Sequence, residues 1–302
     1  MPAFPALTEL ADNYPLPSNA TYKGGITKLH QATTGLLGTT GNAADARTAL
    51  GIGDVITFRG KQINGGFTVN QLQLSGTVTL SAGQYGHDGW KAGASGCTYT
   101  VATSNNITTL TITAGSLQQV IDGAKIDGGV HCLSWTGTAQ GKIGAGSYGA
   151  TGINSTSLTA GSNVTVEFST GTLSMVQFEQ GTVPTPTERR PYPAELLLCQ
   201  QYFWQLNGNT IYAHGQVNGS GSALIFFQFP TQMKTNPSVT ANLVSVTDSG
   251  GSSISLGAVA ISAGGNSTTT LAVSGATGLT AGNATLFIGA SVASFIAFSA
   301  RL

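Results

Sequence analysis

Charged side chains are scarce in this sequence. Asp, Glu, Lys and Arg together make up 8% of the 302 residues, and the formal net charge is +0, whereas globular domains usually carry about 25% charged residues. The sequence has no cluster of Lys or Arg to release counterions from a phosphate backbone, which is the term that drives nucleic-acid binding. We therefore expect no nucleic-acid partner, and we expect Ser, Thr, Asn and Gln to provide the polar surface.

Long apolar runs are also missing. Ser, Thr, Asn and Gly interrupt every hydrophobic stretch before it approaches the roughly 20 residues that a membrane-spanning helix needs. Residues 1–19 have neither the cationic start nor the apolar stretch of a signal peptide. We expect synthesis in the cytoplasm, no secretion and no membrane insertion. Under those conditions Cys97, Cys132 and Cys199 should be reduced, buried side chains.

Motifs for catalysis, metals and cofactors are incomplete. Asp122 and Asp127 could form the carboxylate pair of a glycosidase, but a glycine follows each of them, which is typical of turns. His131 and Cys132 are neighbours that would point to opposite faces of a strand, and no spaced Cys/His set completes a metal site. Residues 144–149 fit the dinucleotide pattern Gly-x-Gly-x-x-Gly, but they lack the strand before it and the helix after it. We expect no enzyme, no catalytic residue, no metal and no cofactor.

What the sequence does contain is the alternation of an all-β chain. Between residues 61 and 181, short alternating runs are bounded by Gly, Asn or Ser, which favours antiparallel strands. Residues 207–302 alternate apolar with small polar side chains, and their charged residues are Lys234, Asp248 and Arg301. We predict two antiparallel β-sandwich domains of jelly-roll type, at 61–182 and 207–302. Because so few charges protect their strand edges, a closed homotrimer is expected.

Two short helices are predicted outside the sandwiches. In the N-terminal region 1–60, Asn42 and Gly51 are suited to begin and end a helix at about 43–50. Four prolines between 184 and 193 indicate a linker at 183–206, with a second helix starting near Pro193. Sister helices of a trimer are expected to cover its wide apolar surface, and a helix packed on its own domain is the alternative. The residues expected at the trimer interface are Leu196, Leu197, Cys199, Tyr202 and Phe203.

Residues 175–203, MVQFEQGTVPTPTERRPYPAELLLCQQYF, resemble a junction found in tail fibres and receptor-binding proteins of tailed bacteriophages. Residues 35–53, GLLGTTGNAADARTALGIG, resemble the proximal region of such fibres. The block from Ile63-Asn64-Gly65-Gly66-Phe67 to residues 175–181 resembles their carbohydrate-binding-module-like sandwich. The resemblance implies a homotrimeric virion fibre that docks through its N-terminal region to baseplate, tail or neck proteins. Its distal tip would bind host polysaccharide or lipopolysaccharide. The virion-attachment residues that it implies are Leu36, Leu37, Leu50 and Ile52.

A first cluster for sugar recognition lies in the 61–182 region. Tyr85, His87, Asp88 and Trp90 could offer a ring to a pyranose face and polar groups to its hydroxyls. A role for these residues in the core and turns of the sandwich is the stronger interpretation.

A second cluster lies near the start of the distal region. Tyr212, His214, Gln216 and Asn218 alternate with small or apolar residues, so the four side chains would share one strand face. We expect receptor contact here, and an ordinary solvent-facing strand is the alternative. The function predicted is adhesion to host glycans. A structural fibre or decoration protein without a specific ligand is the alternative, and a polysaccharide-degrading tailspike ranks below both.

Overall fold

The structure is a computed structural model, and it describes residues 58–250, 253–255, 258–274 and 278–302. The predicted helix at 43–50 and nearly all of the predicted N-terminal region lie outside the described residues. The same holds for the predicted attachment residues, which are Leu36, Leu37, Leu50 and Ile52.

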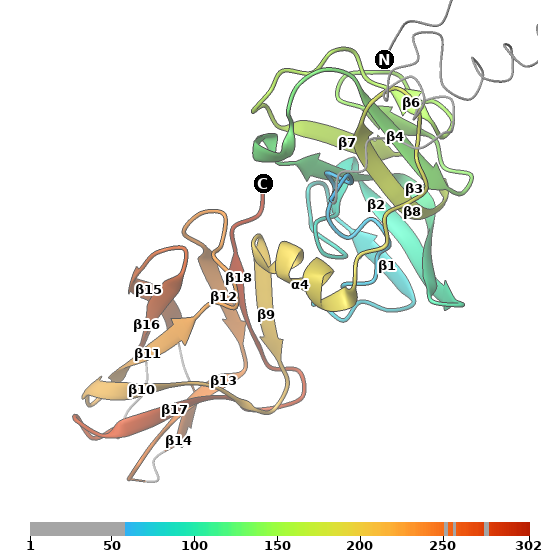
Figure 1. Ribbon diagram of the computed structural model, residues 1–302. Helices are drawn as coiled ribbons and strands as arrows, with labels where there is room; N and C mark the ends of the chain where they lie inside the picture. The colour runs from blue at the N-terminus through green and yellow to red at the C-terminus, as the bar shows by residue number, and fades with distance from the viewer. Residues whose placement is uncertain (1–57, 251–252, 256–257, 275–277) are drawn as a thin grey trace, which may run out of the picture. The chain divides into compact units, whose positions relative to one another are not determined.

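The first β-region comprises strands β1 to β8, which form one antiparallel sheet around a single hydrophobic core (Figure 1). The strand order is β1-β2-β3-β8-β4-β6, and β7 pairs with both β3 and β5. Strand β3 pairs with β8 through residues 110–112 and with β7 through residues 117–121, so this one strand serves two parts of the sheet. The bounds are β1 Thr77–Leu80, β2 Lys91–Ser104, β3 Ile107–Ile121, β4 His131–Thr136, β5 Gly141–Ile143, β6 Ile153–Asn154, β7 Val164–Phe168 and β8 Gly171–Gln180, with a 3₁₀ turn η1 at Gly123–Lys125.

The core of the first β-region contains several aromatic rings from different strands and from the residue before β2. Trp90, Tyr99, Phe168 and Phe178 are fully buried, and the ring centroids of Trp90 and Phe168 lie 5.9 Å apart. Burial of one large apolar side chain stabilises a fold by about 1.5–3 kcal/mol. In β7 the period-two pattern of the sequence matches the burial, because Val164, Val166 and Phe168 face this core.

The segment between β8 and helix α4 (Tyr192–Gln200) runs along the first β-region. The Glu188 carboxylate accepts hydrogen bonds from the backbone amides of Phe58, at 2.8 Å, and Gly60, at 3.0 Å. Arg190 is buried between Glu188 and Glu195, with a nitrogen-to-oxygen distance of 3.3 Å to each. Proline has no backbone N–H to donate to a strand ladder. Hydrogen bonds and ion pairs of the Glu188 and Arg190 side chains hold this segment instead. The predicted linker is consequently docked along its length.

The second β-region comprises β9 to β18 in two sheets. A seven-stranded sheet has the order β14-β13-β17-β10-β11-β16-β15, and a three-stranded sheet has the order β12-β18-β9 (Figure 1). Side chains of both sheets form one core, in which Phe227, Phe287 and Phe298 are central. The bounds are β9 Phe203–Asn207, β10 Ile211–Gly219, β11 Ser222–Gln228, β12 Ser238–Asn242, β13 Val244–Asp248, β14 Ser253–Ser255, β15 Ala258–Gly264, β16 Thr268–Ser274, β17 Ala284–Gly289 and β18 Phe295–Ser299.

The strand pairings of the described residues are all antiparallel, so the all-β prediction is confirmed. Cys97, Cys132 and Cys199 are buried and form no disulfide, as expected. Within the described part of the chain, no helix has the length and apolar character needed to cross a membrane.

Candidate ligand-binding groove

A groove opens in the seven-stranded sheet where two neighbouring strands, β10 and β11, separate. Their pairing ends with His214 opposite Phe226, although β10 begins at Ile211 and β11 continues to Gln228. Beyond this last pair, β10 remains paired with β17, and β11 remains paired with β16. The resulting groove has a volume of about 470 Å³, which lies within the usual range for small-molecule sites. It is lined by Trp204, Tyr212, Ala213, His214, Gly215, Gln216, Phe226, Phe227 and Gln228.

Phe226 and three polar side chains form the exposed rim of this groove. Phe226 is 57% exposed, and His214, Gln216 and Gln228 are also exposed. His214 lies directly opposite Phe226, and residues two positions apart on a strand share a face. In the described part of the chain, none of the three polar side chains donates or accepts a hydrogen bond to protein, so their donors and acceptors face solvent.

Aromatic side chains that belong to the core form the floor of the groove. Trp204 comes from β9 in the opposite sheet, and its ring stacks on that of Phe298 with 5.5 Å between centroids. Phe227 meets Trp204 edge to face at 6.1 Å. Because both rings are held by core packing, the floor is rigid before any ligand arrives.

A register shift in β10 redirects one of the predicted contact residues. The pairing of β10 with β17 shifts between Ile211 and Ala213. Tyr212 is turned toward the core, where its ring lies 6.0 Å from the ring of Phe287 and its hydroxyl donates to the backbone oxygen of Gly208 at 2.7 Å. Partial burial raises the pKa of Tyr212. Tyr212 therefore lines the side of the groove and does not share the exposed strand face as predicted.

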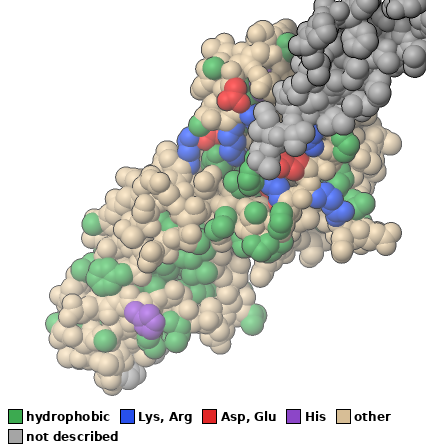
Figure 2. Space-filling model, in the orientation of Figure 1, with side chains coloured by type: hydrophobic (Ala, Val, Ile, Leu, Met, Phe, Trp, Pro, Cys, Tyr) green, Lys and Arg blue, Asp and Glu red, His purple; other side chains and the backbone are tan. Residues whose placement is uncertain are grey.

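Charged side chains are absent from the groove lining in the described residues. In Figure 2 the Lys, Arg, Asp and Glu side chains of this face lie away from the part that contains the histidine, where none is seen among the residues drawn in colour. A charged ligand would find no opposite charge here, while an uncharged ligand would need none.

The chain matches no known protein-family model, and no curated protein matches it. What the groove can hold follows from its geometry: aromatic surface in the floor and on the rim, with amide and imidazole groups beside it. Such a surface suits a ligand with an apolar face and a rim of hydroxyl groups.

Of the four residues predicted on β10, three line the groove and Asn218 does not. The side-chain oxygen of Asn218 accepts a hydrogen bond from the Ser222 hydroxyl at 2.7 Å, across the β10–β11 hairpin. A second register shift, between Val217 and Gly219, separates it from the pairs that precede it. Asn218 thus lies near the end of β10 and is held to the hairpin by Ser222, outside the groove lining.

The predicted sugar cluster of the first β-region does not form a binding surface. His87 and Trp90 are 1% and 0% exposed, so neither ring can stack on a sugar, and the interpretation of these residues as core holds. Burial lowers the pKa of His87 to about 4, and its Nδ1 lies 2.9 Å from the Tyr99 hydroxyl. The Asp88 carboxylate accepts from the backbone amide of Gln71 at 2.8 Å.

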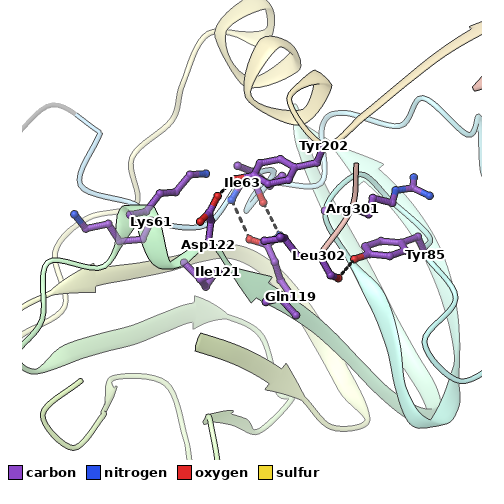
Figure 3. Close-up of a pocket in the computed structure, with 12 residues that line it drawn as sticks. Lys61, Ile63, Tyr85, Gln119, Ile121, Asp122, Tyr202, Arg301 and Leu302 are labelled. Atoms are coloured by element: carbon purple, nitrogen blue, oxygen red, sulfur yellow. Dashed lines mark hydrogen bonds between the residues drawn. The ribbon is translucent and has the colours of Figure 1, made fainter. Parts of the chain in front are cut away.

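Tyr85 lies beside the last residues of the chain, at a small pocket (Figure 3). Its hydroxyl donates to the backbone oxygen of Leu302, which also accepts from Lys91 Nζ at 2.8 Å. The Arg301 guanidinium lies over the rings of Phe203 and Tyr85, 3.5 and 4.5 Å from their centroids. The free volume is about 20 Å³, which is room for about one water molecule. The pocket is therefore filled by the chain's own side chains.

The residues predicted at a trimer interface are mostly covered by the chain itself. Cys199, Tyr202 and Phe203 are 1%, 6% and 4% exposed, and Leu196 is partly buried against the same cluster as Cys199 and Tyr202. These four side chains do not offer a free surface to sister chains, because they pack on other residues of the same chain. Leu196, Cys199 and Tyr202 share a cluster with Ile63 and Val69, and the Arg301 guanidinium lies over the ring of Phe203. Leu197 is 46% exposed and is the predicted interface residue that stays accessible.

The carboxylates considered for hydrolysis are engaged in structural contacts. Asp122 caps η1 and accepts from the Tyr202 hydroxyl at 2.8 Å and from Lys234 Nζ at 2.6 Å. Asp127 lies on the surface and pairs with Lys61 Nζ at 2.7 Å. Among the described residues, no group of three or more His, Cys, Asp or Glu side chains is placed to hold a metal ion.

The sequence interpretation missed Trp204, Phe226 and Gln228. One signal was available, because Phe226 and Phe227 are adjacent in a strand and must point to opposite faces. One of two consecutive phenylalanines then faces outward unless both sides of the sheet are covered. No comparable signal identifies Trp204, which reaches the groove from a strand of the other sheet.

Proposed function

We propose that this chain is a receptor-binding fibre of a tailed-bacteriophage virion, and that it attaches to glycans of the host surface through the groove between β10 and β11. The groove carries the proposal: an aromatic floor packed into the core, an exposed Phe226 and polar side chains that have no hydrogen-bond partner among the described residues lie together. Groups that are already positioned before binding increase affinity, because fewer side chains have to be immobilised when the ligand binds.

The remaining features of the proposal come from the resemblance at residues 35–53, 63–67 and 175–203. In this proposal the chain forms a homotrimer of two jelly-roll-like sandwiches per subunit. The N-terminal region attaches to baseplate, tail or neck proteins, and the protein resides in the virion without acting as an enzyme. Three tips per fibre would raise the effective concentration of weak sites, so that millimolar sugar contacts together give firm capture.

The test uses the full-length chain, labelled with a fluorophore and added to a panel of bacterial strains. We expect saturable binding to at least one strain, and we expect the Phe226→Ala/Gln228→Ala variant to lose most of it. The matched control is Ile211→Ala/Asn218→Ala, which changes two exposed positions of β10 outside the groove lining and should bind as the unchanged chain does. Equal binding by both variants would overturn the groove as the binding site, and no binding of the unchanged chain to any strain would favour a structural fibre. Release of reducing ends from host polysaccharide would instead establish a tailspike enzyme.

The oligomeric state is tested separately by light scattering on the intact chain. We expect the mass of three subunits, with Leu197→Glu reducing it because Leu197 is an accessible apolar residue of α4. A well-folded single subunit in the unchanged protein would refute the trimer.

A further inference from the structure

We propose that the groove between β10 and β11 selects uncharged pyranose glycans, with one sugar ring lying on the exposed face of Phe226. This inference rests on the proposed function, since it names the chemical class of the ligand for the same site. Acidic glycans, which carry carboxylate or phosphate groups, are the class that it excludes.

The first argument is the distribution of charge. The charged residues of 207–302 are Lys234, Asp248 and Arg301, and each is engaged away from the groove. Lys234 pairs with Asp122 at 2.6 Å, Asp248 accepts from the backbone amides of Gly250 and Thr280, and Arg301 lies over two aromatic rings. An anionic group in the groove would lose hydration without gaining a counter-charge, which is unfavourable.

The second argument is the ring of Phe226. It is 57% exposed in a strand that is paired on both sides, with β10 and with β16. The strand fixes the backbone that carries the ring, so the aromatic face has a defined direction. The apolar face of a pyranose can cover this ring, which water otherwise contacts unfavourably.

The third argument is the placement of polar groups around that ring. Gln228 is two residues along the same strand, about 7 Å away in backbone distance, and His214 is directly opposite on β10. Gln216 lies on the diagonal. A primary amide both donates and accepts, as a sugar hydroxyl does, so hydroxyls at either end of a ring on Phe226 have a neutral partner within reach.

Core packing beneath the site holds the aromatic side chains of the groove floor in one arrangement. Trp204 is fixed by its stack on Phe298 and its edge contact with Phe229 at 5.8 Å. Phe227, which is 5% exposed, closes the floor beside it. A second sugar unit would lie beyond the His214–Phe226 pair, where β10 and β11 are no longer paired.

The experiment measures binding of the full chain to a panel of neutral gluco-, galacto- and manno-oligosaccharides and to their uronate counterparts by calorimetry. We expect binding to at least one neutral oligosaccharide, weaker or no binding to its uronate, and the same Kd at low salt and at about 0.5 M salt, because no ion pair contributes. Phe226→Ala should weaken binding about tenfold, which corresponds to about 1.4 kcal/mol. Phe226→Trp should retain it, and Asn218→Ala should change it less than twofold.

Because Phe226 is exposed, Phe226→Ala should keep its unfolding midpoint, and Gln228→Ala provides a second variant that removes no core contact. Tighter binding of a uronate, a strong salt dependence, or unchanged affinity in both variants would overturn the inference. No binding to any neutral oligosaccharide, together with cell binding that still depends on Phe226 and Gln228, would overturn the ligand class while leaving the proposed function standing.

Discussion

Two adjacent glycines in the segment Ile63-Asn64-Gly65-Gly66-Phe67 should respond very differently to the same added methyl group. A Cβ on Gly65 would lie 2.2 Å from the backbone oxygen of Val176, whereas the nearest atom to a Cβ on Gly66 is Thr68 Cγ2 at 3.7 Å. Neither glycine has the left-handed φ that would by itself disfavour alanine. We predict that Gly65→Ala is strongly destabilising and that Gly66→Ala is tolerated.

The size of the expected loss in the free energy of unfolding follows from the contacts of this segment with β8. A carbon and a carbonyl oxygen normally approach to about 3.3 Å, so Gly65→Ala requires a displacement of roughly 1 Å. That displacement strains the hydrogen bond from Val176 N to Gly65 O, which is 2.9 Å long. Overpacking costs about 1–3 kcal/mol and a lost hydrogen bond about 1 kcal/mol, which together give about 2–4 kcal/mol. Gly66→Ala should lie near zero or stabilise by about 0.5 kcal/mol, because alanine restricts the unfolded chain.

Urea unfolding followed by tryptophan fluorescence measures this difference, since Trp90 and Trp135 report on the first β-region and are 0% and 6% exposed. Thermal unfolding should place the midpoint of Gly65→Ala roughly 5–15 °C below that of the unchanged chain. The two variants have the same composition, so their difference isolates the position of the methyl group. Equal midpoints for Gly65→Ala and Gly66→Ala would refute the close approach of this turn to β8.

Three further substitutions test the buried polar groups. Burial lowers the pKa of His87 to about 4, so the unfolded chain takes up a proton below pH 6.5 that the folded chain does not. The free energy of unfolding should therefore fall by up to about 3 kcal/mol as the pH falls from 6.5 to 4. An equally steep fall in His87→Gln would contradict this. Tyr202→Phe removes the hydrogen bond to Asp122 and should lower the free energy of unfolding by about 1.5 kcal/mol, and no loss in urea titrations would show that water replaces it. Burial, assisted by a neighbouring arginine, lowers the pKa of Lys125 to about 8, so Lys125→Met should be more stable than the unchanged chain at pH 7. That advantage should shrink as the pH rises from 8 to 10.5, and a constant difference would be contrary evidence.

Part of the candidate site could be predicted from the sequence, because strand alternation is a local property. His214 and Gln216 were found in this way, since they alternate with small or apolar residues along β10. The departure of Tyr212 from that face could not be found, because it results from a register shift against β17, a strand about 70 residues later. Trp204 joins the groove only when the two sheets pack together.

The cluster of Tyr85, His87 and Trp90 illustrates the opposite error. Its composition suits sugar recognition equally well, and local sequence does not distinguish an aromatic residue that binds a ligand from one that fills a core. Burial in the folded chain does distinguish the two. Trp90 packs on Phe67 and Phe168, which are distant from it in sequence.

By itself, the sequence determined the all-β class and the near absence of charged residues in the second β-region, because hydrophobic period and composition act within a few residues. Tertiary structure alone decided where β10 and β11 part, that the proline segment lies against the first β-region, and that Cys199, Tyr202 and Phe203 are covered by their own chain. Those outcomes depend on the free energy of contacts between distant segments, and no local pattern of residues contains it.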